Sequence, residues 1–340
     1  PWCMDCGSAL AEAEVEYQDK VSHSIDVKFS VIPENLNSAC SVFNIKSISD
    51  LSMVIWTTTP WTIPSNVAVC LNENITYVLV ESSQGNLIIA EDLLDDCSQR
   101  WGIELKVLGK TTGNSLANLS LKHPLYPRES KVLLGDHVTT ENGTGCVHTA
   151  PAHGLDDYFI CIKHKLESIK ALDNRGIFKE EYGSLAGMST KKGDPVVIEL
   201  LQDANALIAI KEYEHSYPHC WRHKTPLIFM ATPQWFISMK KSGLVEGAIN
   251  AVSQVTWEPE WGAQRILSML EDRPDWCISR QRNWGVPIPL IIHRETGDIH
   301  PKQNILFNEI ADVIEQEGIE GWNNLDLETL IGDADQYTKV

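Results

Sequence analysis

Three consecutive threonines, Thr57, Thr58 and Thr59, follow an apolar run and are bracketed by two tryptophans and two prolines. Their hydroxyls can donate and accept hydrogen bonds, so the triplet indicates a site for a polar ligand. Side chains alternate along a strand, and Thr57 and Thr59 are therefore expected on one face, with Thr58 on the other. All three can serve one site only if the chain bends there. The preference of threonine for strands is sufficient to explain any single one of them.

A second group of residues has the spacing of metal ligands. Cys3-x-x-Cys6 opens the sequence, and Cys220-x-x-His223 lies much further along it. Three thiolates and one imidazole form a donor set that suits a tetrahedral structural zinc site. Both spacings also arise without metal, so two metal-free turns are the alternative. A zinc-dependent hydrolase would need an open metal position beside the threonines, and these pairs are better placed for a structural site.

The composition fits a globular chain of two domains, with 340 residues and 43% hydrophobic content. The nine cysteines are odd in number and mostly lie in apolar surroundings, which favours reduced thiols in the cytoplasm. We expect no membrane span, because no apolar run approaches the roughly 20 residues that a span requires. The start lacks a signal-peptide pattern and an initiator methionine, which suggests a piece of a longer chain. The net charge of −18 argues against general binding of nucleic acid, which depends on Lys and Arg.

The threonines must be positioned by the segment before them. Residues 51–56 are apolar except for Ser52 and predict a buried strand, which Pro60 and Pro64 end because proline cannot donate to a strand ladder. Further strands are predicted at 25–31, 67–71, 76–80, 87–90, 103–107 and 207–213, and their spacing indicates a closed or nearly closed sheet. Helices are predicted near 9–14, 91–100, 196–205, 244–252, 261–271 and 307–317. Asp194 and Pro195 are expected as the N-cap and first position of the third.

Residues 143–158 form a second segment that contains candidate functional residues. The pattern predicts a strand that contains His148, then a Pro/Gly turn, then a helix whose first turn carries Asp156 and Asp157. The helix dipole favours carboxylates in this position even when they have no function. A single histidine near a strand end is also often a structural residue. The residues alone therefore leave both a functional and a purely structural role open for His148, Asp156 and Asp157.

Three stretches taken together resemble the bacterial isoleucyl-tRNA synthetases, which are class I aminoacyl-tRNA synthetases. They are Trp-Thr-Thr-Thr-Pro-Trp-Thr at 56–62, Gly-Thr-Gly-Cys-Val-His-Thr-Ala-Pro at 143–151 and Trp-Cys-Ile-Ser-Arg-Gln-Arg-Asn-Trp-Gly at 276–285. Valyl and leucyl enzymes resemble one another in having Thr-Thr-Arg-Pro where this chain has Thr-Thr-Thr-Pro, so the missing arginine favours the isoleucyl branch. The ATP-handling signatures His-Ile-Gly-His and Lys-Met-Ser-Lys-Ser do not occur here. ATP and Mg²⁺ are therefore expected only for the full-length enzyme.

The resemblance implies an α+β architecture, with a β-barrel-like editing domain inserted in a partial α/β Rossmann-type nucleotide-binding domain. It places a stem with a possible zinc knuckle at 1–23, the editing domain at 24–217, and a return stem with part of the catalytic domain at 218–340. The implied activity is hydrolysis of valine wrongly attached to the isoleucine tRNA. The full-length ligase would be a cytoplasmic monomer whose partners are that tRNA, through its aminoacylated 3′ end, and isoleucine or valine. A non-catalytic tRNA-binding module is the alternative.

The need for an editing site follows from the limited discrimination that a binding pocket can achieve. One methylene supplies only about 1–3 kcal/mol of discrimination, a figure obtained in part from enzymes of this class. A second pocket must therefore admit valine and exclude isoleucine. The scissile bond is an ester, so the site needs a placed water, donors for the developing oxyanion and an anchor for the ammonium group. No nucleophile motif has the required spacing, which leaves direct attack by water as the simpler hypothesis.

The resemblance also implies residue roles. Asp157 would anchor the ammonium group, while Asp156 would be only a charge at the helix start. Thr57, Thr58 and Thr59 would present hydroxyl and main-chain N–H groups to the ester and its water. His148 would form a wall of the pocket, with a pKa in the range where it could also orient water.

Further candidates concern the tRNA. Trp61, Thr62 and Asn66 would contact the terminal adenosine, although Asn66 is equally explained as a turn residue after a proline. Arg280, Arg282 and Trp284 would touch the acceptor stem by phosphate pairing and stacking, or else hold a strand in the core.

Overall fold

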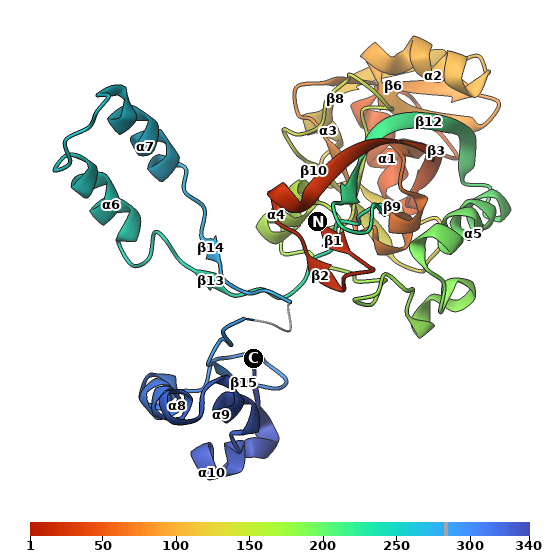
Figure 1. Cartoon of the computed structure of the whole chain (residues 1–340). Coiled ribbons are helices and arrows are strands. Elements are labelled where there is room, and N and C mark those ends of the chain that lie inside the picture. The colour runs from red at the N-terminus through yellow and green to blue at the C-terminus, as the bar shows by residue number, and fades with distance from the viewer. Residues whose placement is uncertain (282–284) are drawn as a thin grey trace. The chain divides into compact units, whose positions relative to one another are not determined.

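The computed structural model describes residues 1–281 and 285–340, which form two compact units, Pro1–Thr232 and Pro233–Val340 (Figure 1). Arg282 and Trp284, two of the residues considered for tRNA contact, lie outside the described residues. The expected domain limits at 23/24 and 217/218 stay predictions.

A large mixed sheet of ten strands is the centre of the first unit. Its strands follow the order β11-β5-β10-β9-β3-β4-β7-β6-β8, and β12 pairs with β3 beside this path. Two pairs, β5 with β10 and β4 with β7, are parallel, and the other pairs are antiparallel. The strands are β3 (Val15–Val31), β4 (Ser52–Thr57), β5 (Ala68–Leu71), β6 (Thr76–Ser82), β7 (Gly85–Ala90), β8 (Lys106–Thr112), β9 (Ser120–Lys122), β10 (Glu129–Leu134), β11 (Val147–Thr149) and β12 (Leu207–Cys220).

The closed barrel expected from the strand spacing is not found among the described residues. Strand pairing leaves β11 and β8 as the ends of the path. β11 has three residues, and its described ladder partner is β5. A backbone hydrogen bond of 2.8 Å from Ala90 N to Thr144 O joins the end of β7 to the loop before β11. The mixed α/β architecture is confirmed, whereas closure of the sheet is not.

Helices and short strands complete the first unit. They are β1 (Trp2–Cys3), β2 (Ser8–Ala9), η1 (Glu12–Glu14), α1 (Pro33–Val42), η2 (Pro60–Ser65), η3 (Glu91–Leu93), α2 (Leu94–Trp101), α3 (Gly113–Leu116), α4 (Leu155–Lys163), η4 (Glu180–Leu185) and α5 (Thr190–Asp203). The core follows the alternation along β3, where Ile25, Val27 and Phe29 are fully buried.

Two predicted helices differ from the structure. The stretch at 9–14 contains only the three-residue η1. The helix expected to start at Pro195 begins earlier, at Thr190, with Ser189 as its N-cap. Asp194 does not cap its own helix because it lies inside α5, four residues after Thr190, and its carboxylate instead accepts a hydrogen bond from Trp61 N at 2.9 Å. The Asp-Pro pattern therefore marked a tertiary contact rather than a helix start.

The second unit contains β13 (Phe236–Ile237), α6 (Leu244–Val252), α7 (Trp261–Glu271), β14 (Trp276–Cys277), β15 (Ile291–His293), α8 (Gln303–Glu317), α9 (Ile319–Asn324), α10 (Leu327–Ile331), η5 (Ala334–Gln336) and β16 (Tyr337–Lys339). α6 and α7 match the predicted ranges. Ile291, Leu306, Ile310 and Trp322 form a small core. The strand pairs described in this unit, β13–β14 and β15–β16, are antiparallel, so the predicted Rossmann-type sheet is not confirmed.

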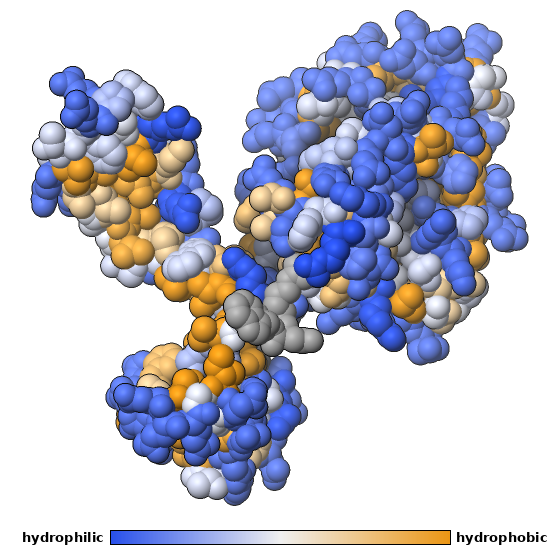
Figure 2. Space-filling model, in the orientation of Figure 1, coloured by the Kyte–Doolittle hydropathy of each residue, from blue (hydrophilic) through white to orange (hydrophobic). Residues whose placement is uncertain are grey.

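The surface of the first unit is mainly hydrophilic in the view of Figure 2. Among the described residues, no helix has the length and apolar character needed to cross a bilayer.

A buried ion pair ties α2 to the sheet and to the loop that leads to β11. Arg100 donates to Asp26 through Nε at 3.0 Å and Nη2 at 2.8 Å, and Nη2 also donates to Gly143 O at 2.9 Å. The Asp26 side chain is only 3% exposed. Its charge is therefore compensated by Arg100 rather than by water.

Replacing Arg100 by Met should destabilise the first unit by about 3–5 kcal/mol, because it leaves the Asp26 carboxylate buried without a partner. Urea unfolding measures this change. The matched control is Lys106→Met, which removes the exposed pair of Lys106 with Glu81 and should cost under about 1 kcal/mol. Equal effects of the two substitutions would contradict this account of the buried pair.

Candidate active site

The threonine triplet lies where β4 passes into η2. Thr57 is the last residue of β4, and Thr59 precedes Pro60, the first residue of η2. Thr57 Oγ1 lies 3.1 Å from Thr59 Oγ1 and accepts a hydrogen bond of 3.1 Å from Thr59 N. This confirms that Thr57 and Thr59 lie on one side of the chain. Thr58 lies at a bend and is half-buried.

Thr62 connects the triplet to His148. Its Oγ1 donates to Thr59 O at 2.8 Å, lies 3.4 Å from Thr59 Oγ1, and lies 2.9 Å from His148 Nε2. His148 is the central residue of β11, and its partner in β5 is Val69. The structure therefore brings the threonines and His148, which are far apart in sequence, into one hydrogen-bonded group.

The hydrogen bond from Asn66 determines which ring nitrogen of His148 carries the proton. Asn66 Nδ2 donates to Ala68 O at 2.8 Å, and Asn66 Oδ1 accepts from Ser130 Oγ at 2.7 Å, which sets the orientation of the amide. The second Nδ2 hydrogen points to His148 Nδ1 at 2.7 Å, so Nδ1 is an acceptor. His148 therefore carries its proton on Nε2 and donates it to Thr62 Oγ1.

The predicted titration of His148 near neutral pH is wrong. Burial, with a smaller effect of nearby His153, lowers the pKa of His148 to about 3. The ring is neutral at physiological pH, and both of its nitrogens already have partners. It therefore has no free nitrogen with which to orient a water. Its role as a wall of the pocket stays a prediction.

The three residues considered for the tRNA end are almost inaccessible. Trp61 is 6% exposed, Thr62 is 5% exposed and Asn66 is fully buried. Trp61 N donates to Asp194 Oδ1, and its ring packs edge-on against His153 at 4.9 Å between centroids. The contacts found for these residues are internal to the protein. Their contact with adenosine stays a prediction.

Asp157 is the third residue of α4, as the sequence indicated. Its Oδ2 accepts a hydrogen bond of 2.8 Å from Ala150 N, two residues after His148. Among the described residues, no hydrogen bond to Oδ1 is found. Burial raises the pKa of Asp157 to about 6, although the Ala150 N–H and the charge of His137 oppose that shift. The carboxylate is therefore ionised at pH 7, while Asp156 is exposed.

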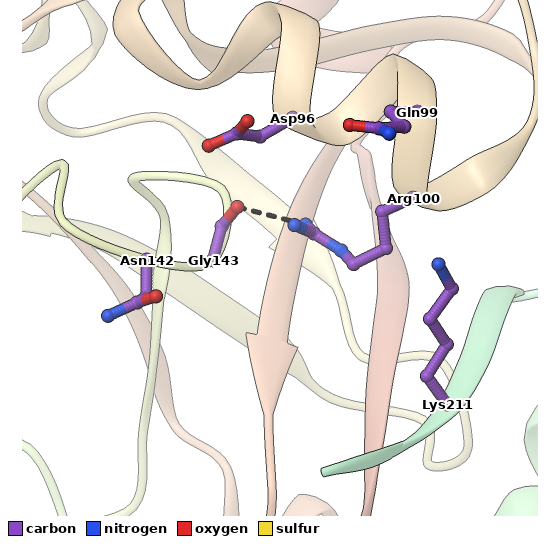
Figure 3. A pocket seen from close by; sticks show the side chains of 6 residues that line it. All are labelled: Asp96, Gln99, Arg100, Asn142, Gly143 and Lys211. Atoms are coloured by element: carbon purple, nitrogen blue, oxygen red, sulfur yellow. Dashed lines mark hydrogen bonds between the residues drawn. The ribbon is translucent and has the colours of Figure 1, made fainter.

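Two cavities lie away from this group. One of about 290 Å³ is lined by Asp96, Gln99, Arg100, Asn142, Gly143 and Lys211 (Figure 3). Another of about 340 Å³ lies near Lys28 and His123. Neither is lined by a threonine of the triplet or by Asp157.

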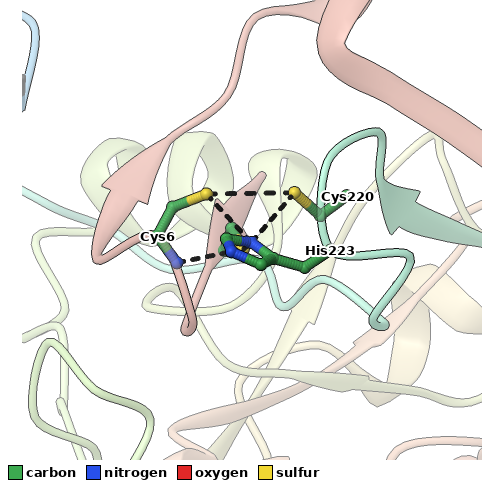
Figure 4. Close-up of side chains that lie close together, drawn as sticks. Cys6, Cys220 and His223 are labelled. Atoms are coloured by element: carbon green, nitrogen blue, oxygen red, sulfur yellow. Dashed lines mark hydrogen bonds between the residues drawn. The ribbon is translucent and has the colours of Figure 1, made fainter.

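The predicted metal ligands lie close together: the sulfurs of Cys3, Cys6 and Cys220 and Nδ1 of His223 are all within 4.8 Å of one another. Figure 4 shows the side chains of Cys6, Cys220 and His223 pointing toward one another. Cys6 Sγ is 3.9 Å from Cys220 Sγ and 3.3 Å from His223 Nδ1, and the His223 nitrogen is 3.7 Å from each of the other two sulfurs. Tetrahedral zinc requires about 3.8 Å between sulfurs and about 3.6 Å from sulfur to nitrogen.

The sequence analysis did not identify three residues that contact the segment 61–66, namely Asp194, Ser130 and His153. The Asp194-Pro195 pair has the pattern of a helix N-cap, which does not indicate the contact of Asp194 with Trp61. His153 lies between Ser65 Oγ at 3.1 Å and Phe229 O at 2.9 Å. Neither partner could be inferred from spacing, because both are distant in sequence.

The chain matches the family model of the class I tRNA synthetases (I, L, M and V) over residues 1–340, and it belongs to that family. It is 49% identical over 349 residues to the isoleucine–tRNA ligase of Idiomarina loihiensis, with 100% of this chain and 37% of that protein covered. The isoleucine–tRNA ligase of Shewanella woodyi is 49% identical over 346 residues, with the same coverage. The chain thus spans little more than a third of the length of these relatives.

A solved structure, the P. knowlesi cytosolic leucyl-tRNA synthetase editing domain, is 13% identical with a TM-score of 0.46, covering 58% of this chain and 97% of that chain. This likeness is too weak to assign a fold.

The ring of His148 should remain in the neutral Nε2–H form from about pH 8 to about pH 5, since burial lowers its pKa to about 3. Nitrogen-15 NMR of the imidazole distinguishes this tautomer from the Nδ1–H form and from imidazolium. In concentrated urea the same ring should titrate near about 6.5, which supplies the internal control. A folded-state midpoint near the urea value would refute the assignment.

Proposed function

We propose that the first unit hydrolyses the ester of valine wrongly attached to the isoleucine tRNA, and that the chain is part of an isoleucine–tRNA ligase. Membership of the family and the names of the relatives support this class of activity. The observation that carries the proposal is the hydrogen-bonded group of Thr57, Thr59, Thr62 and His148, with Asp157 bound to the same segment as His148.

Asp157 is the proposed anchor for the ammonium group of the amino acid. Its Oδ2 is fixed by Ala150 N, so the carboxylate is held in one orientation while Oδ1 can accept from an ammonium. The carboxylate is ionised above about pH 6, which is the form that binds a cation. Neutral His148 adds no positive charge that would compete with the ligand. Asp157 would thus supply the negative charge, and His148 would leave it uncompensated until the ammonium group binds.

The hydroxyls of Thr58 and Thr59 are the accessible members of the triplet, since both are half-buried while Thr57 is buried. Thr59 Oγ1 can donate to Thr57 Oγ1 and still accept a hydrogen bond from water. We propose that these two residues hold the attacking water and the ester oxygens. Thr57 and Thr62 then support Thr59 from the buried side. Catalysis would come from positioning and hydrogen bonding, with no covalent intermediate.

The finer domain description also belongs to this proposal. Residues 24–217 would be the editing domain, residues 1–23 a stem, and residues 218–340 a return stem with part of the Rossmann-type catalytic domain. The whole ligase would use ATP and Mg²⁺ to attach isoleucine to its tRNA, and would act as a cytoplasmic monomer.

Replacing Asp157 by Ala should lower kcat/KM for deacylation of valyl-tRNA by about thirty-fold or more, because a fixed charge partner of the ammonium group is lost. Release of labelled valine from mischarged isoleucine tRNA measures the reaction. Asp156→Ala is the matched control and should leave the rate unchanged, since Asp156 is the exposed neighbour on the same helix turn.

Full activity in the Asp157 variant would remove this residue from the mechanism. Binding of the tRNA without any deacylation by the wild-type chain would favour the non-catalytic module instead.

We further propose that Cys3, Cys6, Cys220 and His223 hold a structural zinc ion. The donor set and the interatomic distances fit tetrahedral coordination, and Cys6 N donates to Cys3 Sγ at 3.3 Å, a bond that favours the thiolate. The ion would cross-link the β1–β2 hairpin to the end of β12. Four protein ligands would leave no open position for substrate, so its contribution would be to stability.

Purified wild-type protein should contain about one zinc ion per chain under reducing conditions, as measured by elemental analysis. Cys220→Ser should lose most of this metal, because oxygen replaces a thiolate ligand. Cys277→Ser is the control, since Cys277 lies outside the cluster and contacts Gln234 and Ser279. Wild-type protein free of zinc would end the proposal.

A further inference from the structure

Asp194 contacts the active-site segment from a distant part of the chain. It lies within α5, and its Oδ1 accepts a hydrogen bond of 2.9 Å from Trp61 N, 133 residues away in sequence. α5 packs directly against η2, the segment that contains Trp61 and Thr62. The side chain of Asp194 is half-buried. A carboxylate in such a place requires partners, and a backbone N–H is one of the strongest available to it.

Trp61 N needs an acceptor from outside η2. Pro60 has no N–H, and the next backbone donor after Trp61, Thr62 N, bonds Thr59 O at 3.0 Å. The side chain of Thr59, which precedes η2, makes no capping hydrogen bond. Asp194 therefore satisfies the first N–H of the segment, at the point where the threonine triplet ends.

The helix that carries Asp194 does not depend on this residue. α5 starts at Thr190 after the N-cap Ser189, and it packs through Val197, Ile198 and Leu201, which are buried. Asp194 makes no hydrogen bond that caps α5. A purely structural role in the helix thus leaves its contact with Trp61 unexplained.

The other end of η2 is held by a different contact. Asn66 directly follows the segment, and its amide bonds His148 Nδ1 and Ala68 O. Between the two ends, Thr62 Oγ1 bridges Thr59 O and His148 Nε2. A displacement of the Trp61 end would therefore move Thr59 and Thr62 relative to His148.

We propose that Asp194 is a positioning residue of the hydrolytic site, which holds η2 so that Thr59 and Thr62 stay in hydrogen-bonding distance of Thr57 and His148. This inference rests on the proposed deacylation of valyl-tRNA. Asp194 does not touch the ester in this scheme. It acts through the backbone of Trp61.

Asp194→Ala tests the role with two independent measurements. Hydrogen exchange at the Trp61 amide, followed by NMR, should become at least about ten-fold faster, since the N–H loses its acceptor. Deacylation of valyl-tRNA should lose about ten-fold or more in kcat with KM within about two-fold, because alignment of the threonines is lost while the ammonium anchor remains. Asp203→Ala, at the exposed end of α5, is the matched control and should change neither value.

Asp194→Asn keeps a carbonyl oxygen that can accept from Trp61 N, and it should restore both exchange protection and kcat to within about three-fold of wild type. This second variant decides the question if the alanine variant fails to fold. A slow asparagine variant, or an alanine variant with unchanged exchange at Trp61, would overturn the positioning role. If the wild-type protein shows no deacylation, the proposed function fails, while the exchange measurement still reports on the Asp194 contact.

Discussion

The hydrogen bonds of His148 are the constraint on which the proposed site depends. One ring nitrogen accepts from Asn66 and the other donates to Thr62, so two segments distant in sequence, β11 and η2 with its C-cap residue, share a single buried group. Removing any one partner would leave a buried polar atom unsatisfied, which costs more than the bond itself contributes. The ring is therefore held in one tautomer and one orientation. The same constraint fixes the hydroxyl of Thr62 and, through it, the position of Thr59.

The sheet explains how these groups meet. β11 pairs with β5 so that His148 lies opposite Val69, three residues after Asn66. The loop before β11 is held by Tyr77, whose hydroxyl donates to Gly145 O at 2.7 Å. Gly145 has φ of +75°, and a Cβ at this position would lie 2.3 Å from Ala90 Cβ, so only glycine allows the approach. The Gly-Thr-Gly pattern is thus a requirement of packing beside the site.

Features set by short sequence patterns could be predicted, whereas burial and the pairing of distant strands could not. Helix-start composition placed Asp157 in the first turn of α4, and ligand spacing identified the Cys/His cluster. Thr57 and Thr59 also lie together as expected, but β4 ends at Thr57, so a hydrogen-bonded bend rather than strand alternation brings them together. The titration of His148 was misjudged because its pKa depends on burial, which the sequence pattern at 143–151 does not reveal. Closure of the sheet was also misjudged, because the number and spacing of strands do not fix which strands pair at the ends of the path.

Three histidines, of which His123 and His148 are buried and His153 is half-buried, contact η2, and each has both ring nitrogens engaged. His123 Nε2 lies 2.9 Å from Ile63 O, and its Nδ1 accepts from two backbone amides; His153 and His148 are likewise occupied. Burial is the main reason that the pKa values of all three fall to about 3 or 4. None of them is suited to accept a proton from water at neutral pH. In the proposed deacylation, placement of the water and of the ammonium group would supply the rate enhancement that these histidines do not. The proposed site would accordingly depend on fixed hydroxyls and one ionised carboxylate rather than on a general base.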